Sequence, residues 1–324
     1  MKQRDHRTLR GTASKPPRNI FGTIRNPNEA QKHMKMDIAL EWFLNPDHLP
    51  FVAAIETGRF AQAGLEVTLI APDDHYDGLE AVARGEIAFA CNEPLHMVDA
   101  HRPDLRALGC FFETRGGILL RPDARERLLN GEPIRLASPV AGEVTDDIAR
   151  EILARWVRNH GGTLAPEQLR IESAGFNHIE NIKQGFDGAW LCFFNFEGIE
   201  ARHHGLDLVF IGTDDVDMAN FSALELFTGA DFLAREPEAI DRFCTIVSES
   251  AALCRDNPQT AAELWYRHVG ARPEPMMDAI LADTCKRLIT PLQRDPERWR
   301  AMWAQFDRLG LARIDEAAFD ALYR

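Results

Sequence analysis

The feature that most constrains this chain is a regular alternation between short apolar runs and segments with helical spacing. Apolar runs typical of strands occupy residues 37–43, 65–70, 87–91, 134–137, 169–172 and 188–193. Segments in which apolar residues recur with helical period occupy residues 49–63, 76–84, 144–159 and 178–184. Strands that alternate with helices predict βαβ units and mostly parallel sheets. After residue 232 the pattern becomes almost wholly helical, so we expect two α/β blocks followed by a helical tail.

The loops that follow the predicted strands are the expected place for a ligand, because open parallel sheets bind ligands beyond the carboxyl ends of their strands. These loops are residues 42–48, 71–76, 92–96, 138–145, 193–197 and 221–225. They contain no lysine or arginine, and their acidic residues are Asp47, Asp73, Asp74, Glu93, Glu143, Glu197 and Glu225. Burying a phosphate dianion among carboxylates is costly unless helix N-termini compensate for it. The loops therefore predict a neutral or cationic, amino-substituted heterocycle, although Asp73 and Asp74 also fit helix N-caps or solvated loop charges.

Composition and motifs exclude several classes of protein. The net charge of −13 and the pI near 5.3 argue against nucleic acid or an anionic membrane surface as a partner. Apolar stretches are far shorter than the ~20 residues that span a bilayer, so no membrane insertion is expected. The GxGxxG, GxxxxGK(S/T), HExxH and GxSxG motifs are absent. No metal site is predicted, because no cysteines have CxxC spacing and the adjacent His203 and His204 point to different sides of a helix.

The first 35 residues form a basic extension that we predict to be disordered. They lack the apolar core of a secretory signal, so the chain as given is expected in the cytoplasm. A start assigned too far upstream is the alternative, because Met34 and Met36 stand immediately before the first predicted strand.

Two motifs carry a resemblance to a known family. Residues 54–67 (AIETGRFAQAGLEV) fit an ExGxFxxxGLxV signature, and residues 81–90 (AVARGEIAFA) fit a second signature. Together with residues 232–238 and 256–258, they make the chain resemble the thiamine pyrimidine synthase-like family over about residues 36–290.

The resemblance implies an α/β architecture, the type II periplasmic-binding-protein fold, in which two α/β lobes joined by two crossovers enclose a ligand cleft. Residues 36–122 and 223–324 would form lobe 1, and residues 123–222 would form lobe 2. The resemblance also implies the periplasm, if the start of the chain is misassigned.

The family has two functional branches. One contains solute-binding subunits of ABC importers, including binders of thiamine pyrimidine precursors. The other contains the synthase, which makes hydroxymethylpyrimidine phosphate from pyridoxal phosphate and one of its own histidines in a single turnover. This chain resembles the synthase at Trp42, His48 and His96, the last of which falls on the donor histidine. Asn92 stands where the synthase has its pyridoxal-binding lysine, so no Schiff base can form there.

Two further synthase features are changed. Its cysteine-rich iron motif would fall on residues 218–222, where only Phe221 remains and no thiolate is available to iron. Its glycine-rich phosphate loop would fall near residues 138–142, which are poorer in glycine. These changes favour a binding protein over an enzyme; as an enzyme, the chain would be thiamine pyrimidine synthase-like.

The strand-end loops and the resemblance together predict the ligand contacts. Trp42 and Phe193, or its neighbour Phe194, would stack on a ring, with burial in the core as the alternative. His48 and His96 would hydrogen-bond a ligand or be structural histidines. The predicted ligand-binding set is Trp42, Asn45, His48, Asn92, Glu93, His96, Ser138, Gly142, Phe193, Asn195 and Glu225.

The leading functional hypothesis is a solute-binding protein that clamps a small nitrogen heterocycle, of the thiamine-pyrimidine type, and closes by a hinge motion. It needs no cofactor, and its expected partner is an ABC permease. The alternative is a divergent synthase that uses His96 with pyridoxal phosphate and iron. A third hypothesis is a cytosolic sensor with neither transport nor chemistry. The segment after residue 290, with Trp299, Trp303 and Phe306 at helical spacing, is predicted to dock on lobe 1.

Overall fold

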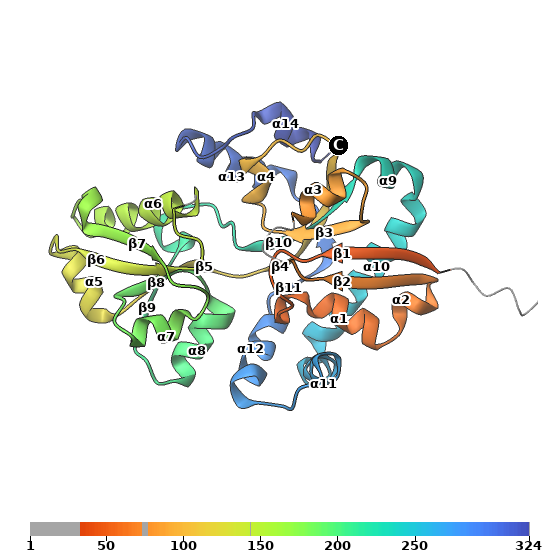
Figure 1. Ribbon diagram of the computed structural model, residues 1–324, viewed down its shortest axis with the longest axis horizontal. Helices are drawn as coiled ribbons and strands as arrows, with labels where there is room; N and C mark the ends of the chain where they lie inside the picture. Colours follow the sequence, from red (N-terminus) through yellow and green to blue (C-terminus); the bar gives the residue numbers. More distant parts are fainter. Residues whose placement is uncertain (1–32, 73–76, 143, 324) are drawn as a thin grey trace, which may run out of the picture. The chain divides into compact units, whose positions relative to one another are not determined.

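The computed structural model describes residues 33–72, 77–142 and 144–323, which belong to one compact unit (Figure 1). The predicted basic extension lies outside the described residues, apart from its end at residues 33–35. Asp73, Asp74 and Glu143 lie outside them as well. No helix formed by the described residues is both long and apolar enough to cross a membrane.

A six-stranded mixed sheet forms the first lobe. Its strands are β1 (Met34–Ala39), β2 (Leu65–Ile70), β3 (Phe89–Asn92), β4 (Leu105–Glu113), β10 (Ala223–Gly229) and β11 (Leu288–Gln293), in the spatial order β11-β4-β10-β3-β1-β2. β1 runs parallel to β2 and β3, whereas β10 runs antiparallel to β3 and β4. The expectation of a mostly parallel sheet is wrong for this half, because the chain re-enters the sheet from the second lobe through β10.

A five-stranded mixed sheet forms the second lobe. Its strands are β5 (Gly116–Leu120), β6 (Ile134–Ser138), β7 (Leu169–Ser173), β8 (Gly188–Phe193) and β9 (Val209–Gly212), in the order β7-β6-β8-β5-β9. β6 runs parallel to β7 and β8, and β5 runs antiparallel to β8 and β9. We placed the end of the first segment of lobe 1 at residue 122, but β5 pairs within the second sheet. The chain therefore crosses to the second lobe before β5.

Helices cover the two sheets (Figure 1). Those in the chain segments of the first sheet are α1 (Leu49–Glu56), α2 (Arg59–Gln62), α3 (Gly78–Ala83), α4 (His96–Asp99), α9 (Ala230–Arg235), α10 (Pro237–Asp256), α11 (Pro258–Val269), α12 (Pro275–Cys285), α13 (Pro296–Arg308) and α14 (Glu316–Ala321). Those of the second sheet are α5 (Pro122–Leu129), α6 (Val144–Asn159), α7 (His178–Lys183) and α8 (Ile199–His203). The single helix predicted at residues 49–63 is divided at Gly58, whose φ of +71° suits glycine. β11 interrupts the region after residue 232 that we predicted to be helical.

The first sheet packs against α1, α2 and α10 through phenylalanine rings. Phe243 of α10 stacks on Phe89 of β3 and Phe60 of α2, with ring centroids 4.2 and 5.0 Å apart. Phe51 of α1 meets Phe111 of β4 edge-on at 4.9 Å. Burying each ring contributes about 1.5–3 kcal/mol. This core holds the carboxyl ends of β1 and β3 in place.

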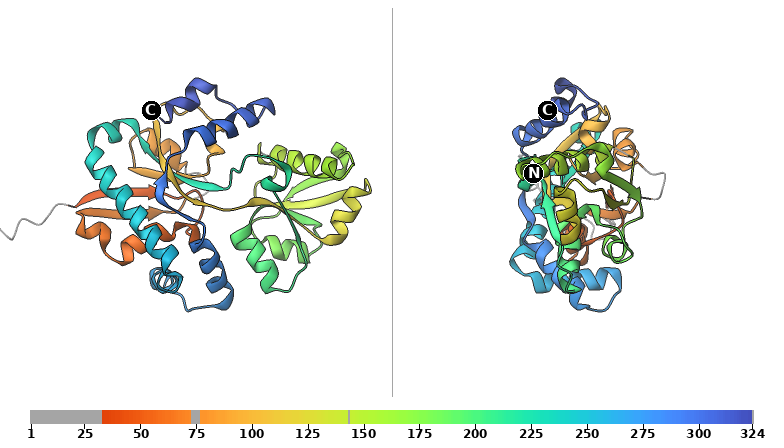
Figure 2. Two further views of the ribbon diagram at one scale, coloured as in Figure 1. Left: turned by 180° about the vertical axis from the view of Figure 1, so that it is seen from behind. Right: turned by 90° about the vertical axis from the view of Figure 1, so that its left-hand side faces the viewer.

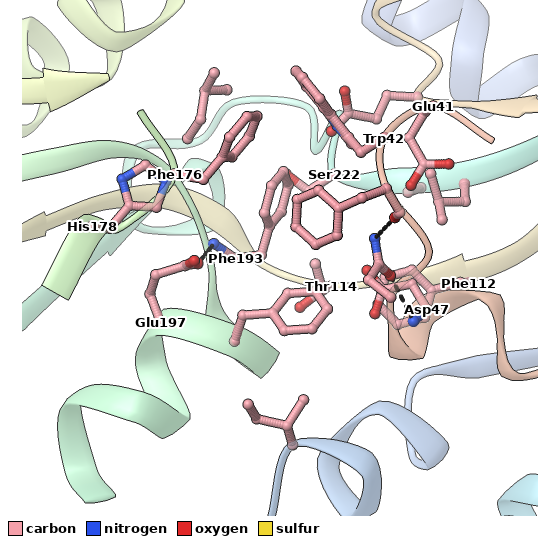
Figure 3. A pocket seen from close by; sticks show the side chains of 18 of the residues that line it. Glu41, Trp42, Asp47, Phe112, Thr114, Phe176, His178, Phe193, Glu197 and Ser222 are labelled. Atoms are coloured by element: carbon pink, nitrogen blue, oxygen red, sulfur yellow. Dashed lines mark hydrogen bonds between the residues drawn. The ribbon is translucent and has the colours of Figure 1, made fainter. Parts of the chain in front are cut away.

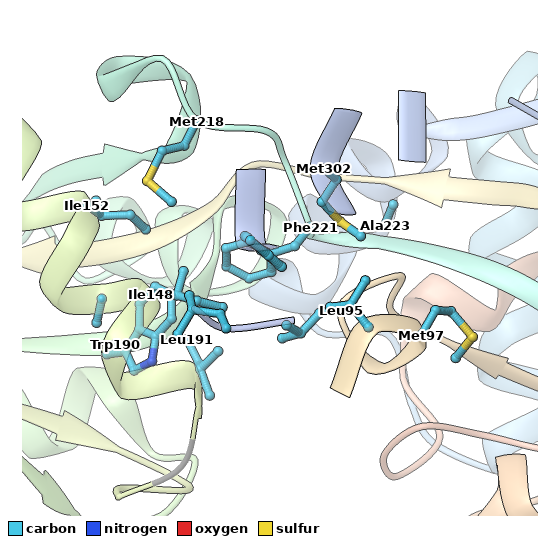
Figure 4. Close-up of a cluster of buried hydrophobic side chains, with 14 of the residues drawn as sticks. Leu95, Met97, Ile148, Ile152, Trp190, Leu191, Met218, Phe221, Ala223 and Met302 are labelled. Atoms are coloured by element: carbon cyan, nitrogen blue, oxygen red, sulfur yellow. The ribbon is translucent and has the colours of Figure 1, made fainter. Parts of the chain in front are cut away.

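A second group of buried apolar side chains continues from one sheet to the other (Figure 4). Trp190 and Leu191 belong to β8 of the second lobe, whereas Leu95 and Met302 belong to the first lobe. Phe221, in the returning crossover, belongs to the same cluster and is 1% exposed. The two lobes therefore share apolar contacts where the chain passes between them.

Two crossover segments join the sheets, residues 114–115 and residues 217–222 (Figure 2, from behind). They hydrogen-bond to each other, because the Thr114 N–H donates to the Ser222 carbonyl at 2.9 Å. A Cβ at Gly116 would lie 1.5 Å from Ser222 Oγ, so the close approach of the crossovers requires glycine there. This approach brings Thr114 and Ser222 together.

The C-terminal helices α13 and α14 pack on the first lobe, which confirms the predicted docking segment. Trp299 and Phe306 are buried, and Trp303 is half-buried. The Tyr323 hydroxyl, which follows α14, donates to Glu225 Oε2 of β10 at 3.0 Å. The tail is therefore fixed to the sheet by both apolar and polar contacts.

Candidate functional site

A cavity of about 180 Å³, which we name the first cavity, lies where strand ends of both sheets meet the crossovers (Figure 3). The loops after β1, β3 and β7 and the end of β8 line it, together with Thr114 and Ser222 of the crossovers. Pockets for drug-sized ligands occupy about 300–1,000 Å³. The first cavity is smaller and suits a single substituted ring.

Aromatic side chains from both lobes form much of the wall of the first cavity. Trp42 follows β1, whereas Phe176 follows β7 and Phe193 ends β8. The ring of Phe176 meets Trp42 edge-on at 4.9 Å and Phe43 at 5.9 Å. Phe43 and Phe176 are 58% and 44% exposed, which is unusual for large apolar side chains. These rings therefore connect the two lobes at the rim and offer faces on which a heteroaromatic ring can stack.

Three buried polar groups that line the first cavity have no hydrogen-bond partner among the described residues. They are the Thr114 and Ser222 hydroxyls and Nδ1 of His178, and each of these residues is 2% exposed. Leaving such a group unpaired costs about 1–3 kcal/mol. Burial also lowers the pKa of His178 to about 4, so its ring is neutral at physiological pH. A ligand that supplied the missing partners would recover this cost.

Carboxyl groups form the polar part of the wall. Glu41, Asp47, Glu93, Glu197 and Glu200 line the first cavity, and none of its described lining residues is lysine or arginine. Burial raises the pKa of Glu197 to about 8, although the Phe193 N–H donates to its Oε2 at 2.7 Å. At neutral pH this carboxyl is protonated and offers both a donor and an acceptor.

Two of these carboxyls occupy contrasting surroundings. Burial and the nearby charge of Glu41 raise the pKa of Asp47, to which Asn195 Nδ2 donates at 2.8 Å. Burial acts on Glu41 in the same direction, but the charge and hydrogen bond of His48 outweigh it and lower the Glu41 pKa. The wall therefore combines a carboxyl whose pKa is lowered, Glu41, with carboxyls whose pKa values are raised, Asp47 and Glu197.

A short turn after β1 positions this part of the wall. Residues Pro46–His48 form one turn of 3-10 helix, η1, and the Asn45 side chain caps it by accepting from the Asp47 N–H at 2.9 Å. The Asn45 N–H in turn lies 3.1 Å from Nδ1 of His48. Asn45 at the cap and Pro46 at the first position favour such a turn. The turn directs Asp47 toward the cavity and His48 toward β1.

A second cavity, of about 510 Å³, adjoins the first and shares Trp42, Glu93 and Phe193 with it. Arg102 and Arg313 line it, together with His96. The Arg102 guanidinium also lies 3.2 Å from Asp77 Oδ2. The expectation that the cleft lacks cationic side chains therefore applies to the first cavity and is wrong for the second, because Arg102 and Arg313 come from segments outside the strand-end loops.

Several predicted ligand residues do line a cavity. Trp42, Asn45, Glu93 and Phe193 line the first. His96 lines the second, with its Nε2 3.6 Å from Glu93 Oε2. Asn92 lines a separate depression that also includes His96 and Trp42.

His48 and Asn195, predicted to contact a ligand, lie behind the wall. Both are 0% exposed, and neither is among the described residues that line the two cavities. His48 Nε2 lies 3.0 Å from Glu41 Oε2, and Asn195 Nδ2 also donates to Thr284 Oγ1 at 3.0 Å. These two residues position wall carboxyls rather than lining the cavity.

Glu225, Ser138 and Gly142 are also outside the described linings of the two cavities. Alternate side chains of a strand point to opposite faces, and Glu225 points to the face that α14 covers. Burial raises its pKa to about 8. Ser138 Oγ accepts from an N–H two residues later at 3.3 Å, and the Gly142 N–H donates to Asp146 Oδ2 at 2.6 Å, so this loop is closed by its own hydrogen bonds.

Sequence reasoning missed Thr114, Ser222, Phe176 and His178. The loop after β7 obeys the same strand-end rule as the others, so the sequence does carry a signal for Phe176 and His178. Thr114 lies in the first crossover, which the predicted lobe boundary at residue 122 placed too late in the chain. Ser222 had no signal beyond its place in residues 221–225.

Comparisons with known proteins identify relatives of this chain. The sequence model of the NMT1/THI5-like family matches residues 45–115 and 136–261. A 4-amino-5-hydroxymethyl-2-methylpyrimidine phosphate synthase from Legionella pneumophila is 22% identical over 236 residues, which cover 71% of this chain and 72% of that protein. A formylaminopyrimidine-binding protein from Halalkalibacterium halodurans is 21% identical over 281 residues, which cover 84% of each chain.

Solved structures share the fold. The alkanesulfonate-binding protein SsuA from Xanthomonas axonopodis pv. citri, bound to MOPS, superposes with a TM-score of 0.64 at 12% identity and covers 90% of this chain and 98% of its own. This likeness confirms the predicted two-lobe α/β architecture of periplasmic binding proteins. The family match spans more than half of the sequence and confirms the resemblance that the two N-terminal motifs carry. The chain belongs to the NMT1/THI5-like family.

Proposed function

We propose that this protein is a solute-binding protein whose first cavity holds a small amino-substituted nitrogen heterocycle of the thiamine-pyrimidine type. The observation that carries the proposal is the pairing of aromatic faces from both lobes with carboxyl groups and unpaired hydroxyls, in a cavity with no described lysine or arginine in its lining. The relative that binds formylaminopyrimidine supports the same class of ligand. Binding of this kind requires no cofactor.

The recognition chemistry follows from the side chains present. Trp42 and Phe193 supply ring faces for stacking. The protonated carboxyl of Glu197 donates to a ring nitrogen and accepts from the adjacent exocyclic amine. The hydroxyls of Thr114 and Ser222 pair with the remaining polar edge. Because the two rings come from different lobes, a bound ligand stabilises the closed arrangement of the lobes.

Calorimetric titration tests the proposal. We expect a 2-methyl-4-aminopyrimidine to bind the purified protein and pyridoxal phosphate to bind more weakly. Trp42→Ala should weaken binding of the aminopyrimidine at least 10-fold through lost stacking and buried area. The half-buried Trp303 is the matched control, because its Nε1 donates to Ile314 O outside the cavity, so Trp303→Ala should leave the affinity unchanged. Tighter binding of pyridoxal phosphate, or equal effects of the two substitutions, contradicts the proposal.

A second candidate function, a divergent pyrimidine synthase, is favoured by one observation. His96, the position of the donor histidine, lines the second cavity beside Arg102 and Arg313, whose charges suit a phosphate. The relative from Legionella pneumophila carries the synthase name. Asn92 in place of the lysine and the loss of cysteines at residues 218–222 oppose this function.

Mass analysis separates the two candidates. The protein is incubated with pyridoxal phosphate, iron and oxygen, and its intact mass and the peptide containing His96 are then measured. The binding function predicts an unchanged His96, whereas loss of imidazole atoms at this residue would establish the synthase.

The ABC permease and the periplasmic location remain part of the proposal. One protein with this fold, from Staphylococcus aureus, is described as the ligand-binding component of an ABC-type import system, which supports the permease. Another, SsuA from Escherichia coli, is described as a periplasmic binding protein, which supports the location. Cell fractionation of the host is the direct measurement: we expect the protein outside the cytoplasmic membrane, and a wholly cytosolic protein would favour the sensor hypothesis.

A further inference from the structure

Behind the wall of the first cavity, three side chains with metal-binding atoms converge. Nε2 of His48 lies 3.0 Å from Oε2 of Glu41, and Sγ of Cys91 lies 3.2 Å from the same oxygen. All three atoms lie within 4.8 Å of one another. We propose that Glu41, His48 and Cys91 form a binding site for a divalent transition-metal ion of the zinc class. The sequence analysis predicted no metal site, because these residues, separated by 7 and 50 positions, match no ligand-spacing motif.

The cluster stands on a rigid part of the fold. Glu41 follows β1, Cys91 belongs to β3, and these neighbouring strands run parallel in the first sheet. His48 ends the capped turn η1. His48 and Cys91 are 0% and 1% exposed, and the Glu41 side chain is 4% exposed. Donor atoms on well-packed elements are held in place before an ion arrives, which is what a metal site requires.

The donor set indicates the class of ion. A thiolate, an imidazole nitrogen and a carboxylate oxygen together suit zinc, and cobalt(II) takes the same ligands, whereas magnesium and calcium prefer oxygen alone. Zinc bonds of about 2.0–2.3 Å in tetrahedral geometry place donor atoms about 3.3–3.7 Å apart. The observed 3.0 and 3.2 Å are a few tenths shorter, as expected for groups that hydrogen-bond to one another in the metal-free protein.

The surroundings of His48 support the same assignment. A histidine that binds a metal through one ring nitrogen usually donates its other N–H to a carbonyl or carboxylate. Nδ1 of His48 lies 3.1 Å from the Asn45 carbonyl oxygen. The Asn45 N–H also lies 3.1 Å from Nδ1, so in the metal-free protein Nδ1 can accept from it while Nε2–H donates to Glu41. With the proton on Nδ1 instead, the Asn45 carbonyl accepts from Nδ1, and the lone pair of Nε2 faces Glu41 and can coordinate an ion.

The cluster supplies three protein ligands and leaves a fourth position. Glu41 reaches the first cavity and is part of its lining, whereas His48 and Cys91 are not among the described lining residues. A water molecule or ligand atom from the cavity would therefore complete the coordination, an arrangement typical of zinc sites that keep an open position.

Metal binding exchanges protons for the ion. Cys91 loses its thiol proton to solvent and coordinates as the thiolate. Nε2 of His48 gives up the proton that it shares with Glu41, so His48 coordinates as the neutral imidazole through the lone pair of Nε2, with its one proton on Nδ1 against the Asn45 carbonyl. Glu41 coordinates as the carboxylate. The ion thus replaces the hydrogen atoms that otherwise lie between these groups.

Cobalt(II) is the probe, because a thiolate bound to cobalt gives a sulfur-to-metal charge-transfer band in the near ultraviolet. The full chain is freed of metal with a chelator and titrated with cobalt(II) and, separately, with zinc. We expect one equivalent to bind, with the charge-transfer band. Cys91→Ser should abolish the band and weaken zinc binding at least 10-fold.

Cys110→Ser is the matched control, because Cys110 is a buried cysteine of β4 in the same sheet, and its Sγ donates to the Phe112 carbonyl. It should leave the band and the affinity unchanged. Glu41→Gln, which keeps the shape of the side chain, should weaken zinc binding while circular dichroism reports an unchanged fold. Absence of stoichiometric binding to the wild-type chain, or a band that persists in Cys91→Ser, would show that the cluster is only a hydrogen-bonded group and overturn the proposal. Neither result bears on heterocycle binding, which calorimetry measures separately.

Discussion

At the scale of single residues, the carboxyl groups of the site differ in protonation because their surroundings differ. His48 keeps Glu41 ionised against the effect of burial, whereas no described cation lines the first cavity near Glu197. A cavity with both kinds of carboxyl can accept from an amine at one point and donate to a ring nitrogen at another. Such a pattern discriminates an aminopyrimidine from a phosphate ester, which offers only acceptors.

Glu197 gives the first prediction. Its pKa is raised from 4.5 to about 8 by burial, so between these pH values the native protein holds a proton that the unfolded chain releases. The contribution of this residue to stability is fully present below about pH 4.5 and is lost as pH rises through about 8. Glu197→Gln, which keeps a neutral side chain, should therefore gain stability relative to wild type as pH rises from 5 to 8.5.

Urea unfolding of both proteins at several pH values measures this difference. Glu238→Gln, on the exposed first turn of α10, is the control and should show no such trend. A stability difference between Glu197→Gln and wild type that stays constant across the range would contradict the raised pKa.

At the scale of elements, the C-terminal helices complete the first lobe rather than the site. Trp299 and Phe306 of α13 bury their rings, and Tyr323 after α14 supplies the hydrogen bond to the buried Glu225. Glu225 is thus a structural group, and its side-chain hydrogen bond comes from Tyr323 at the C-terminal end of the described residues. The prediction took residues 221–225 as a loop after a strand, but Glu225 lies within β10, near its amino-terminal end, and is brought beside the carboxyl end of β3 because the two strands are antiparallel.

The second prediction concerns this contact. Tyr323→Phe removes the donor and leaves the Glu225 carboxyl buried without it, which should lower the free energy of unfolding by about 1–3 kcal/mol. Ligand affinity should not change, because the contact lies away from the first cavity. The comparison is Asp320→Asn, which breaks a surface ion pair with Arg300 and should cost at most about 1 kcal/mol. If the two substitutions lowered the free energy of unfolding equally, the buried Tyr323–Glu225 hydrogen bond would contribute no more to stability than a surface ion pair.

At the scale of the whole molecule, function depends on how the two lobes meet. Apolar contacts around Phe221 and the hydrogen bond between Thr114 and Ser222 connect the lobes near the crossovers. Phe176 connects them at the rim through Trp42 and Phe43. The crossovers are thus the natural hinge, and the rim aromatics are the contact that opening must break.

Phe176→Ala gives the third prediction. An aromatic pair contributes about 0.5–1.5 kcal/mol beyond its buried area, so ligand dissociation should become about 2- to 10-fold faster, with a smaller effect on association. Stopped-flow tryptophan fluorescence measures both rates. Phe232→Ala is the control, because Phe232 lines a groove beside α9 and should not affect either rate. If the dissociation rate of Phe176→Ala were unchanged, the contact of Phe176 with Trp42 and Phe43 would not contribute to holding the lobes closed.

The local sequence pattern was sufficient to predict the bounds of several helices and strands. β2, α6 and β8 have the predicted bounds, because helical spacing, strand alternation and glycine punctuation act between residues that are near in sequence. The family motifs also follow from contiguous residues. Trp42, Glu93 and Phe193 were predictable as cavity residues because they directly follow or end strands that the pattern already revealed.

Tertiary structure alone decided the rest. β10 returns antiparallel, and this return places Ser222 beside Thr114 and Glu225 beneath Tyr323. Arg102 and Arg313 reach one cavity although they are far apart in sequence. These long-range contacts depend on which sheet a strand joins and on which face of the sheet a side chain points to. The spacing of apolar residues along the sequence determines neither.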